Sequence, residues 1–102
     1  MGSRNFDKPI TVLKFGTHTR VSQGSSQTNT VMILGFQSGV VEVHEIVKGD
    51  FKLRAKLILH EGSLISDLLT MSFMTNIKGI DVQVAAFLIG DQKGKLSYWQ
   101  LT

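Results

Sequence analysis

The stretches at residues 34–46 and 89–101 decide the fold of this chain, because one repeats the other. The first is LGFQSGVVEVHEI and the second is IGDQKGKLSYWQL, with both glycines, the glutamine and the apolar positions in common. Ile10 and Ile65 fall in register at the same separation, so the match extends back to the first strand of each unit. The sequence therefore contains two copies of one supersecondary unit.

Apolar runs bounded by turn residues predict three strands in each copy. In the first copy these are residues 10–15, 31–34 and 40–46, and a fourth strand is expected at 51–59. In the second copy they are residues 64–73, 84–89 and 95–101, where the fourth strand is missing. The polar segments at 16–30 and 75–81 are expected to be a loop and a connector, since they offer many turn formers and little to bury.

The paired glycines mark tight turns between the second and third strands. A Gly-x-x-x-Gly spacing recurs in both copies and is similar to that of phosphate-binding loops, but such a loop needs a helix after it. Here each spacing joins strand to strand, so we interpret the four glycines as structural residues of hairpin turns: Gly35, Gly39, Gly90 and Gly94.

The second strand of each copy is apolar at consecutive positions, so both of its faces must be covered. No segment is a convincing amphipathic helix, which leaves one sheet stacked on another as the cover. Two sheets can cover only one face of each other. The expected fold is therefore all-β, with two antiparallel blade-like sheets of three or four strands that are incomplete alone, as in a β-propeller of about 4–8 blades.

The order of these features resembles a WD-repeat β-propeller over nearly the whole chain. It has a strand that opens after His60, a Gly-x-x-x-Gly turn, and a strand ending in YWQL at Trp99 and its neighbours. The resemblance implies that His60 and Trp99 belong to a hydrogen-bonded structural set. Three of its other positions depart from the family: Lys93 stands where it has an acidic residue, Ala85 and Ala86 stand where it has Ser or Thr on the second strand, and Gln100 stands where it has Asp.

Length and composition bound the rest. At 102 residues, with 42% hydrophobic and 19% charged, the chain is one globular unit or part of one. We expect a tail or edge segment at 1–8, a first blade-like repeat at 9–59 and a second at 60–102. The absence of cysteine excludes disulfides and thiol chemistry, and the lack of a secretion signal favours an intracellular protein, cytoplasmic or nuclear. No apolar stretch approaches the ~18 residues of a membrane span.

Catalysis and metal binding have little support. Glu42 and His44 are two residues apart on one strand and so share a face, as an acid/base pair would require, but no third group converges on them. The histidines His18, His44 and His60 lie on separate elements without ligand spacing. We therefore expect no enzyme activity, no cofactor and no metal.

The best candidates for recognition are a row of cations on the outer strand and the two hairpin turns. Lys52, Arg54 and Lys56 form a stripe at period two, which could meet an acidic partner or simply prevent edge-to-edge pairing of the strand. The turn candidates are Gln37, Ser38, Gln92 and Lys93.

The function expected from the resemblance is a non-catalytic scaffold for protein–protein interaction in a multi-subunit complex. Its partners would be other proteins or further propeller blades, including copies of the chain assembled into a ring. The alternative is a nucleic-acid-binding module, in a transcription- or RNA-related complex, that uses the basic outer strand.

Overall fold

The computed structural model describes residues 9–22, 25–58 and 60–101, so the segment predicted as a tail, 1–8, lies outside the described residues. Two antiparallel sheets make up the fold. Sheet 1 has the order β1-β2-β3-β4, and its strands are β1 (Ile10–Ser22), β2 (Ser25–Phe36), β3 (Val41–Val47) and β4 (Asp50–Leu57). Sheet 2 has the order β5-β6-β7, and its strands are β5 (Ile65–Ile77), β6 (Ile80–Asp91) and β7 (Leu96–Gln100). The all-β prediction is confirmed, and the described residues hold no helix that could cross a membrane.

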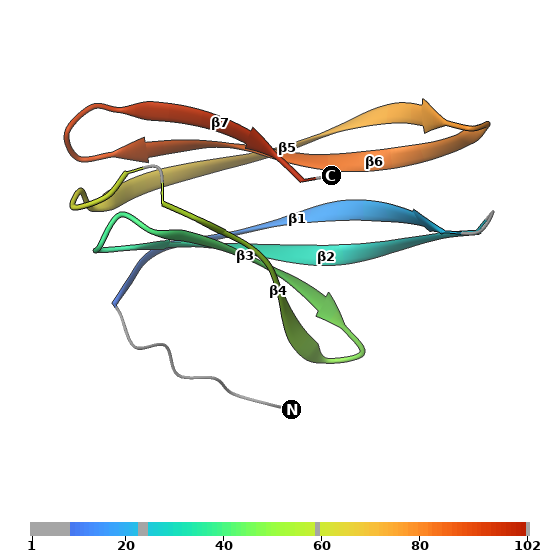
Figure 1. Ribbon diagram of the computed structural model, residues 1–102, viewed down its shortest axis with the longest axis horizontal. Helices are drawn as coiled ribbons and strands as arrows, with labels where there is room; N and C mark the ends of the chain where they lie inside the picture. Colours follow the sequence, from blue (N-terminus) through green and yellow to red (C-terminus); the bar gives the residue numbers. More distant parts are fainter. Residues whose placement is uncertain (1–8, 23–24, 59, 102) are drawn as a thin grey trace.

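The two sheets lie face to face, with β1 packed against β5 and β6 (Figure 1). The core between them takes its side chains from the inner face of each sheet. From sheet 1 come Val31, Ile33, Val41 and Val43, and from sheet 2 come Ile65, Leu68, Ala85, Phe87 and Ile89, with Leu101 after β7. All of these side chains are buried, so sheet-on-sheet packing supplies the hydrophobic stabilisation of the fold.

The other face of β2 is buried too. Met32, Leu34 and Phe36 alternate with the inner-facing residues and form a second cluster, against which Val40 and Phe51 pack. Consecutive apolar positions on this strand therefore do serve two faces, as the sequence predicted.

Two expected irregular segments are instead strand. The polar residues at 16–22 and 25–30 belong to β1 and β2, in which Thr17 pairs with Thr30 and Ser22 with Ser25, and residues 23–24 lie outside the described residues. The connector predicted at 75–81 is likewise the end of a hairpin, with a tight turn at Lys78 and Gly79, which both have positive φ. Both predictions were wrong because a two-stranded ribbon satisfies its backbone hydrogen bonds with few buried apolar side chains, so polar composition does not by itself indicate a loop.

The outer strand β4 also differs from its predicted pattern. Strict alternation would place Phe51, Leu53, Ala55 and Leu57 on one face, but a bulge lies where β4 pairs with Val43 and His44. Ala55 and Leu57 pack against the core between the sheets, whereas Phe51 packs on the opposite cluster. One extra residue in a strand places every side chain after it on the opposite face of the sheet, and the alternation of residue types in the sequence does not show where this happens.

Candidate functional site: the outer face of sheet 2

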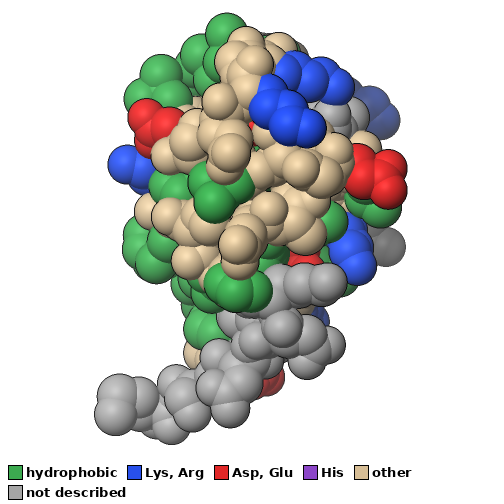
Figure 2. Space-filling model, turned by 90° about the vertical axis from the view of Figure 1, so that its left-hand side faces the viewer, with side chains coloured by type: hydrophobic (Ala, Val, Ile, Leu, Met, Phe, Trp, Pro, Cys, Tyr) green, Lys and Arg blue, Asp and Glu red, His purple; other side chains and the backbone are tan. Residues whose placement is uncertain are grey.

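Sheet 2 carries hydrophobic side chains on the face turned away from sheet 1. We call this set the apolar patch, and it consists of Leu69, Met71, Leu88, Leu96 and Tyr98. Four of the five are exposed, among them Leu96 at 68%, Leu69 at 57% and Tyr98 at 53% of their surface. Figure 2 shows hydrophobic side chains exposed at the top of the molecule, over sheet 2, close to Lys and Arg side chains.

Strand register makes the apolar patch continuous. Leu88 on the middle strand pairs with Leu69 on one side and with Tyr98 on the other, so these three side chains form a row across the sheet. Leu96 pairs with Gly90, which has no side chain to cover it. A contiguous exposed patch of this kind marks an interaction surface more often than scattered exposed residues do.

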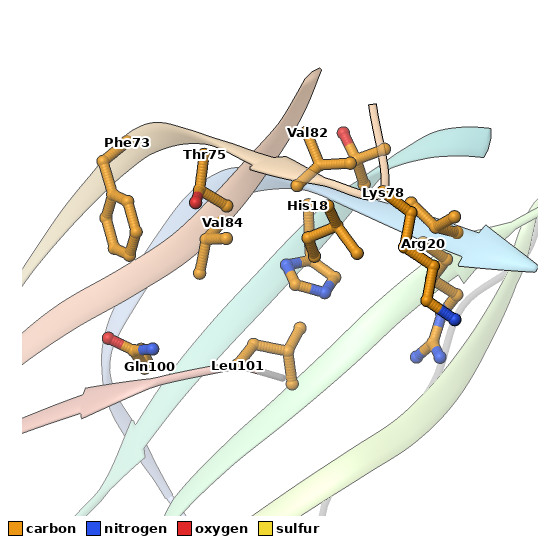
Figure 3. Close-up of a pocket in the computed structure, with 12 residues that line it drawn as sticks. His18, Arg20, Phe73, Thr75, Lys78, Val82, Val84, Gln100 and Leu101 are labelled. Carbon is orange, nitrogen blue, oxygen red and sulfur yellow. The ribbon is translucent and has the colours of Figure 1, made fainter. Parts of the chain in front are cut away.

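A cavity of about 710 Å³ lies where the β5–β6 ribbon continues beyond the end of β7 (Figure 3). Phe73, which pairs with Val84, brings the patch side of this ribbon to the cavity. Its apolar walls include Val82, Val84 and Leu101, while its polar lining includes the buried His18 and two cationic side chains, Arg20 and Lys78. The cavity therefore extends the apolar patch toward a positively charged edge.

The end of β1 covers an edge of β6 that β7 is too short to pair. The backbone N–H of Ala85 donates to Nδ1 of His18 (3.3 Å), and the N–H of Gln83 donates to Oγ1 of Thr19 (3.1 Å). Burial lowers the pKa of His18, and the nearby Arg20 charge lowers it further. A neutral His18 thus accepts a backbone hydrogen bond between the sheets.

A buried histidine–carboxylate pair joins the connection between the sheets to the β6–β7 turn. Nδ1 of His60 lies 2.8 Å from Oδ2 of Asp91, and both side chains are buried. The other Asp91 oxygen, Oδ1, accepts the backbone N–H groups of Lys93 and Lys95. The hydrogen bond from His60 is the main reason that the pKa of Asp91 is lowered to about 2. Asp91 was not predicted from the sequence as a partner of His60, although its place at the start of the turn was an available signal.

Sheet 1 holds a second buried carboxylate. Oε1 of Glu45 accepts from Nε of Arg20 (2.8 Å) and from Nε of Arg54 (2.6 Å), while Oε2 accepts from Nδ2 of Asn29 (2.6 Å). Burial raises the pKa of Glu45, but these three donors outweigh it and hold the pKa below its ordinary value. The bulge in β4 brings Arg54 within reach, and sequence periodicity gave no signal of it.

The predicted cationic stripe is therefore not one surface. Lys52 pairs with Glu45 and Lys56 with Glu42, on opposite faces of sheet 1, and Arg54 is bound to Glu45. The prediction that the three cations share a face was wrong, because the bulge lies among them.

The predicted turn residues lie in the two hairpin turns. Gln37, Gln92 and Lys93 are exposed, whereas Ser38 is half-buried and its Oγ is buried.

Glu42 and His44 share a face, with Oε1 2.8 Å from Nε2, and His44 is fully buried. The ring of Trp99 is half-buried and packs on Phe87 at a centroid distance of 5.4 Å.

Comparisons of the chain with family models, with curated proteins and with solved structures find no match. Within the part of the chain that the structure describes, no group of three His, Cys, Asp or Glu residues is placed to hold a metal ion.

Proposed function

We propose that this chain is a pair of WD-repeat-like propeller blades that acts as a non-catalytic scaffold for protein–protein interaction in an intracellular complex. The sheet orders β1-β2-β3-β4 and β5-β6-β7, stacked face to face, support a blade architecture. The buried bond between His60 and Asp91 supports it further, because it ties the start of the second sheet to a hairpin turn.

The observation that carries the proposal is the apolar patch. Its exposed members lie on one face of sheet 2, and covering them with another protein surface would remove apolar area from water, which is favourable. Interface centres are enriched in Tyr and Met and poor in charge, which is the composition of this face. The partner therefore binds by covering sheet 2.

The nucleic-acid alternative receives less support from the geometry. Phosphate binding gains from cations on one surface, but Lys52 and Lys56 face opposite ways and the Arg54 guanidinium is bound to Glu45. We keep this alternative as an outcome of the test.

The test compares two charge variants of the full 102-residue chain as baits for affinity purification. L96K/Y98K alters the apolar patch, and the matched control K52E/K56E alters the outer strand. We expect proteins retained by the wild type and by K52E/K56E to be lost with L96K/Y98K. Equal retention by all three contradicts the proposal. Binding of a labelled RNA or DNA oligonucleotide that weakens steeply with salt, and is lost only in K52E/K56E, would favour the alternative.

A further inference from the structure

The two sheets repeat one another down to single hydrogen bonds. The N–H of Phe36 bonds to the carbonyl of Val40, and in the second sheet the N–H of Asp91 bonds to the carbonyl of Lys95. A bulge follows Ile10 at the start of β1, and the same bulge follows Ile65 at the start of β5. The positions of β1, β2 and β3 therefore have defined counterparts in β5, β6 and β7.

Within the chain, Ile65 closes the contact between the sheets by sitting over Gly35. A Cβ placed on Gly35 would lie 2.5 Å from Cγ2 of Ile65, so the glycine is needed for this close approach. Thr11 secures the same point, since its hydroxyl donates to the carbonyl of Ile65 (2.6 Å). The contact is thus a knob from the second sheet set into a notch on the first.

The counterpart of this notch, at Gly90, is open. A Cβ on Gly90 would meet only the carbonyl oxygen of Asp67, at 4.0 Å. The hydroxyl of Ser66, the counterpart of Thr11, donates to the carbonyl of Gly90 (3.3 Å), and Oγ1 of Thr11 lies at a similar distance, 3.1 Å, from the carbonyl oxygen of Gly35. Sheet 2 thus has an open notch at the position of the filled one in sheet 1, with no residue of the described chain filling it. The two notches differ in one neighbour, since Asp67 stands in place of Val12, whose Cγ1 would lie 2.7 Å from a Cβ on Gly35.

The hydrophobic residues of sheet 1 that sheet 2 covers also have hydrophobic counterparts on the outer face of sheet 2. The sheet 1 residues that sheet 2 covers are Val31, Ile33, Val41 and Val43, and their counterparts in the repeat are Ala86, Leu88, Leu96 and Tyr98. Three of these counterparts belong to the apolar patch. The patch is therefore the surface on which a further sheet of the same kind would pack.

The face of sheet 1 that is turned away from sheet 2 carries hydrophobic residues that could pack on the apolar patch of another copy. Ile10 is the counterpart of Ile65 and is 44% exposed, and Leu13 is the counterpart of Leu68 and is 46% exposed. Phe15 lies beside Leu13 on the same face and is 54% exposed. On sheet 1, these residues occupy the positions that correspond to those with which sheet 2 packs against sheet 1.

We propose that a second copy of this chain docks on the apolar patch, with its Ile10 in the notch at Gly90. The inference rests on the proposed function and names its partner. The contact joins two different surfaces, so it repeats head to tail, and it either closes into a ring or continues as an open stack. A ring of three or four copies would hold six or eight sheets, which lies within the about 4–8 sheets of closed propellers.

The experiment measures the mass of the full chain by light scattering across a concentration series. Two variants each remove one side of the contact: L13K/F15K on sheet 1 and L96K/Y98K on sheet 2. Lysine is used on both so that the altered faces repel each other. We expect the wild type to form trimers, tetramers or longer stacks, each variant alone to be monomeric, and an equimolar mixture to form a heterodimer through the two intact faces.

A notch variant, G90V, tests the point of contact. Because its side chain enters open space in the single chain, the fold should persist while self-association weakens about tenfold or more. The control is M74K, which places a charge on an exposed methionine outside the apolar patch and should leave assembly unchanged. Circular dichroism and Trp99 fluorescence verify folding of every variant.

A monomeric wild type, or a dimer that persists in L13K/F15K alone, overturns head-to-tail docking. If the wild type is monomeric but protein capture still depends on the apolar patch, the partner is a different protein and the proposed function stands. If the chain is monomeric and capture does not depend on the patch, both fail.

Discussion

The imidazole of His60 lies with its Nδ1 atom 2.8 Å from Oδ2 of Asp91, so a residue of the connection between the sheets is bound to the turn between β6 and β7. The carboxylate also accepts two backbone N–H groups of that turn. One buried pair therefore fixes both the start of sheet 2 and the shape of its hairpin, and the stability of this arrangement depends on pH.

Replacing Asp91 by Asn should remove part of the loss of stability in acid. The pKa of Asp91 is about 2 in the folded chain, below its ordinary value of 3.8. The stabilising ionised form is thus fully present above about pH 4 and is lost as the pH falls toward 2. Thermal unfolding should give a lower Tm for D91N at pH 7, with the difference from the wild type shrinking below pH 4. D81N, at an exposed position, is the control, and a constant difference at all pH values would contradict the prediction.

His18 should make stability fall at a higher pH. Burial and the Arg20 charge lower the pKa of His18 from its ordinary value of 6.5. At a pH between the lowered pKa and 6.5, the unfolded chain therefore binds a proton at this residue that the folded chain does not. Stability therefore decreases as the pH falls through 6.5. The variant H18Q keeps a hydrogen-bond acceptor near the N–H of Ala85. Its free energy of unfolding, measured in urea, should change less between pH 7.5 and pH 5 than that of the wild type. T19V removes the neighbouring hydrogen bond without a titrating group, so its profile should keep the slope of the wild type.

The charge on Glu45 should contribute measurably to stability. The variant E45Q deprives Arg20, Arg54 and Asn29 of a charged acceptor in a buried position, and we expect urea unfolding to show a loss of about 2 kcal/mol. E61Q alters an exposed carboxylate and should stay within about 0.5 kcal/mol of the wild type. If E45Q unfolds with the same free energy as the wild type, the prediction is contradicted, and the three donors find equivalent partners in water.

The two turn glycines Gly39 and Gly94 should respond differently to the same change. Both have positive φ, 92° and 89°, but a Cβ on Gly39 would lie 1.8 Å from the carbonyl oxygen of His60, whereas one on Gly94 meets nothing within 4 Å. We expect G94A to cost about 1–2 kcal/mol from backbone strain alone. G39A adds a clash with backbone and should cost more than about 3 kcal/mol. Equal losses in urea unfolding would show that the connection at His60 moves freely.

Much of the fold could be predicted from the sequence because its periodic signals are local. The apolar runs and paired glycines gave the strands and turns of both sheets, and the consecutive apolar positions of β2 gave a strand buried on both faces. Polar composition was misleading at residues 16–22 and 25–30, since this ribbon is held by backbone pairing, and that pairing leaves no apolar signature in the sequence.

The candidate site was harder to predict because it depends on which face each residue occupies. Strict alternation predicts that the cations of β4 share a face, but the bulge beside Val43 and His44 places Lys52 and Lys56 on opposite faces. Asp91 could have been noticed at the start of its turn, but only the packing of the connection brings His60 to it.

The sequence by itself determined that this chain is a repeated antiparallel unit with more apolar faces than its own sheets can cover, because repetition and side-chain alternation are properties of neighbouring residues. Only the tertiary structure decided which faces meet. It set Ile65 into the notch at Gly35 and left the counterpart at Gly90 open, since that choice depends on bulges, sheet twist and the distance between sheets, which residues far apart in the chain set together.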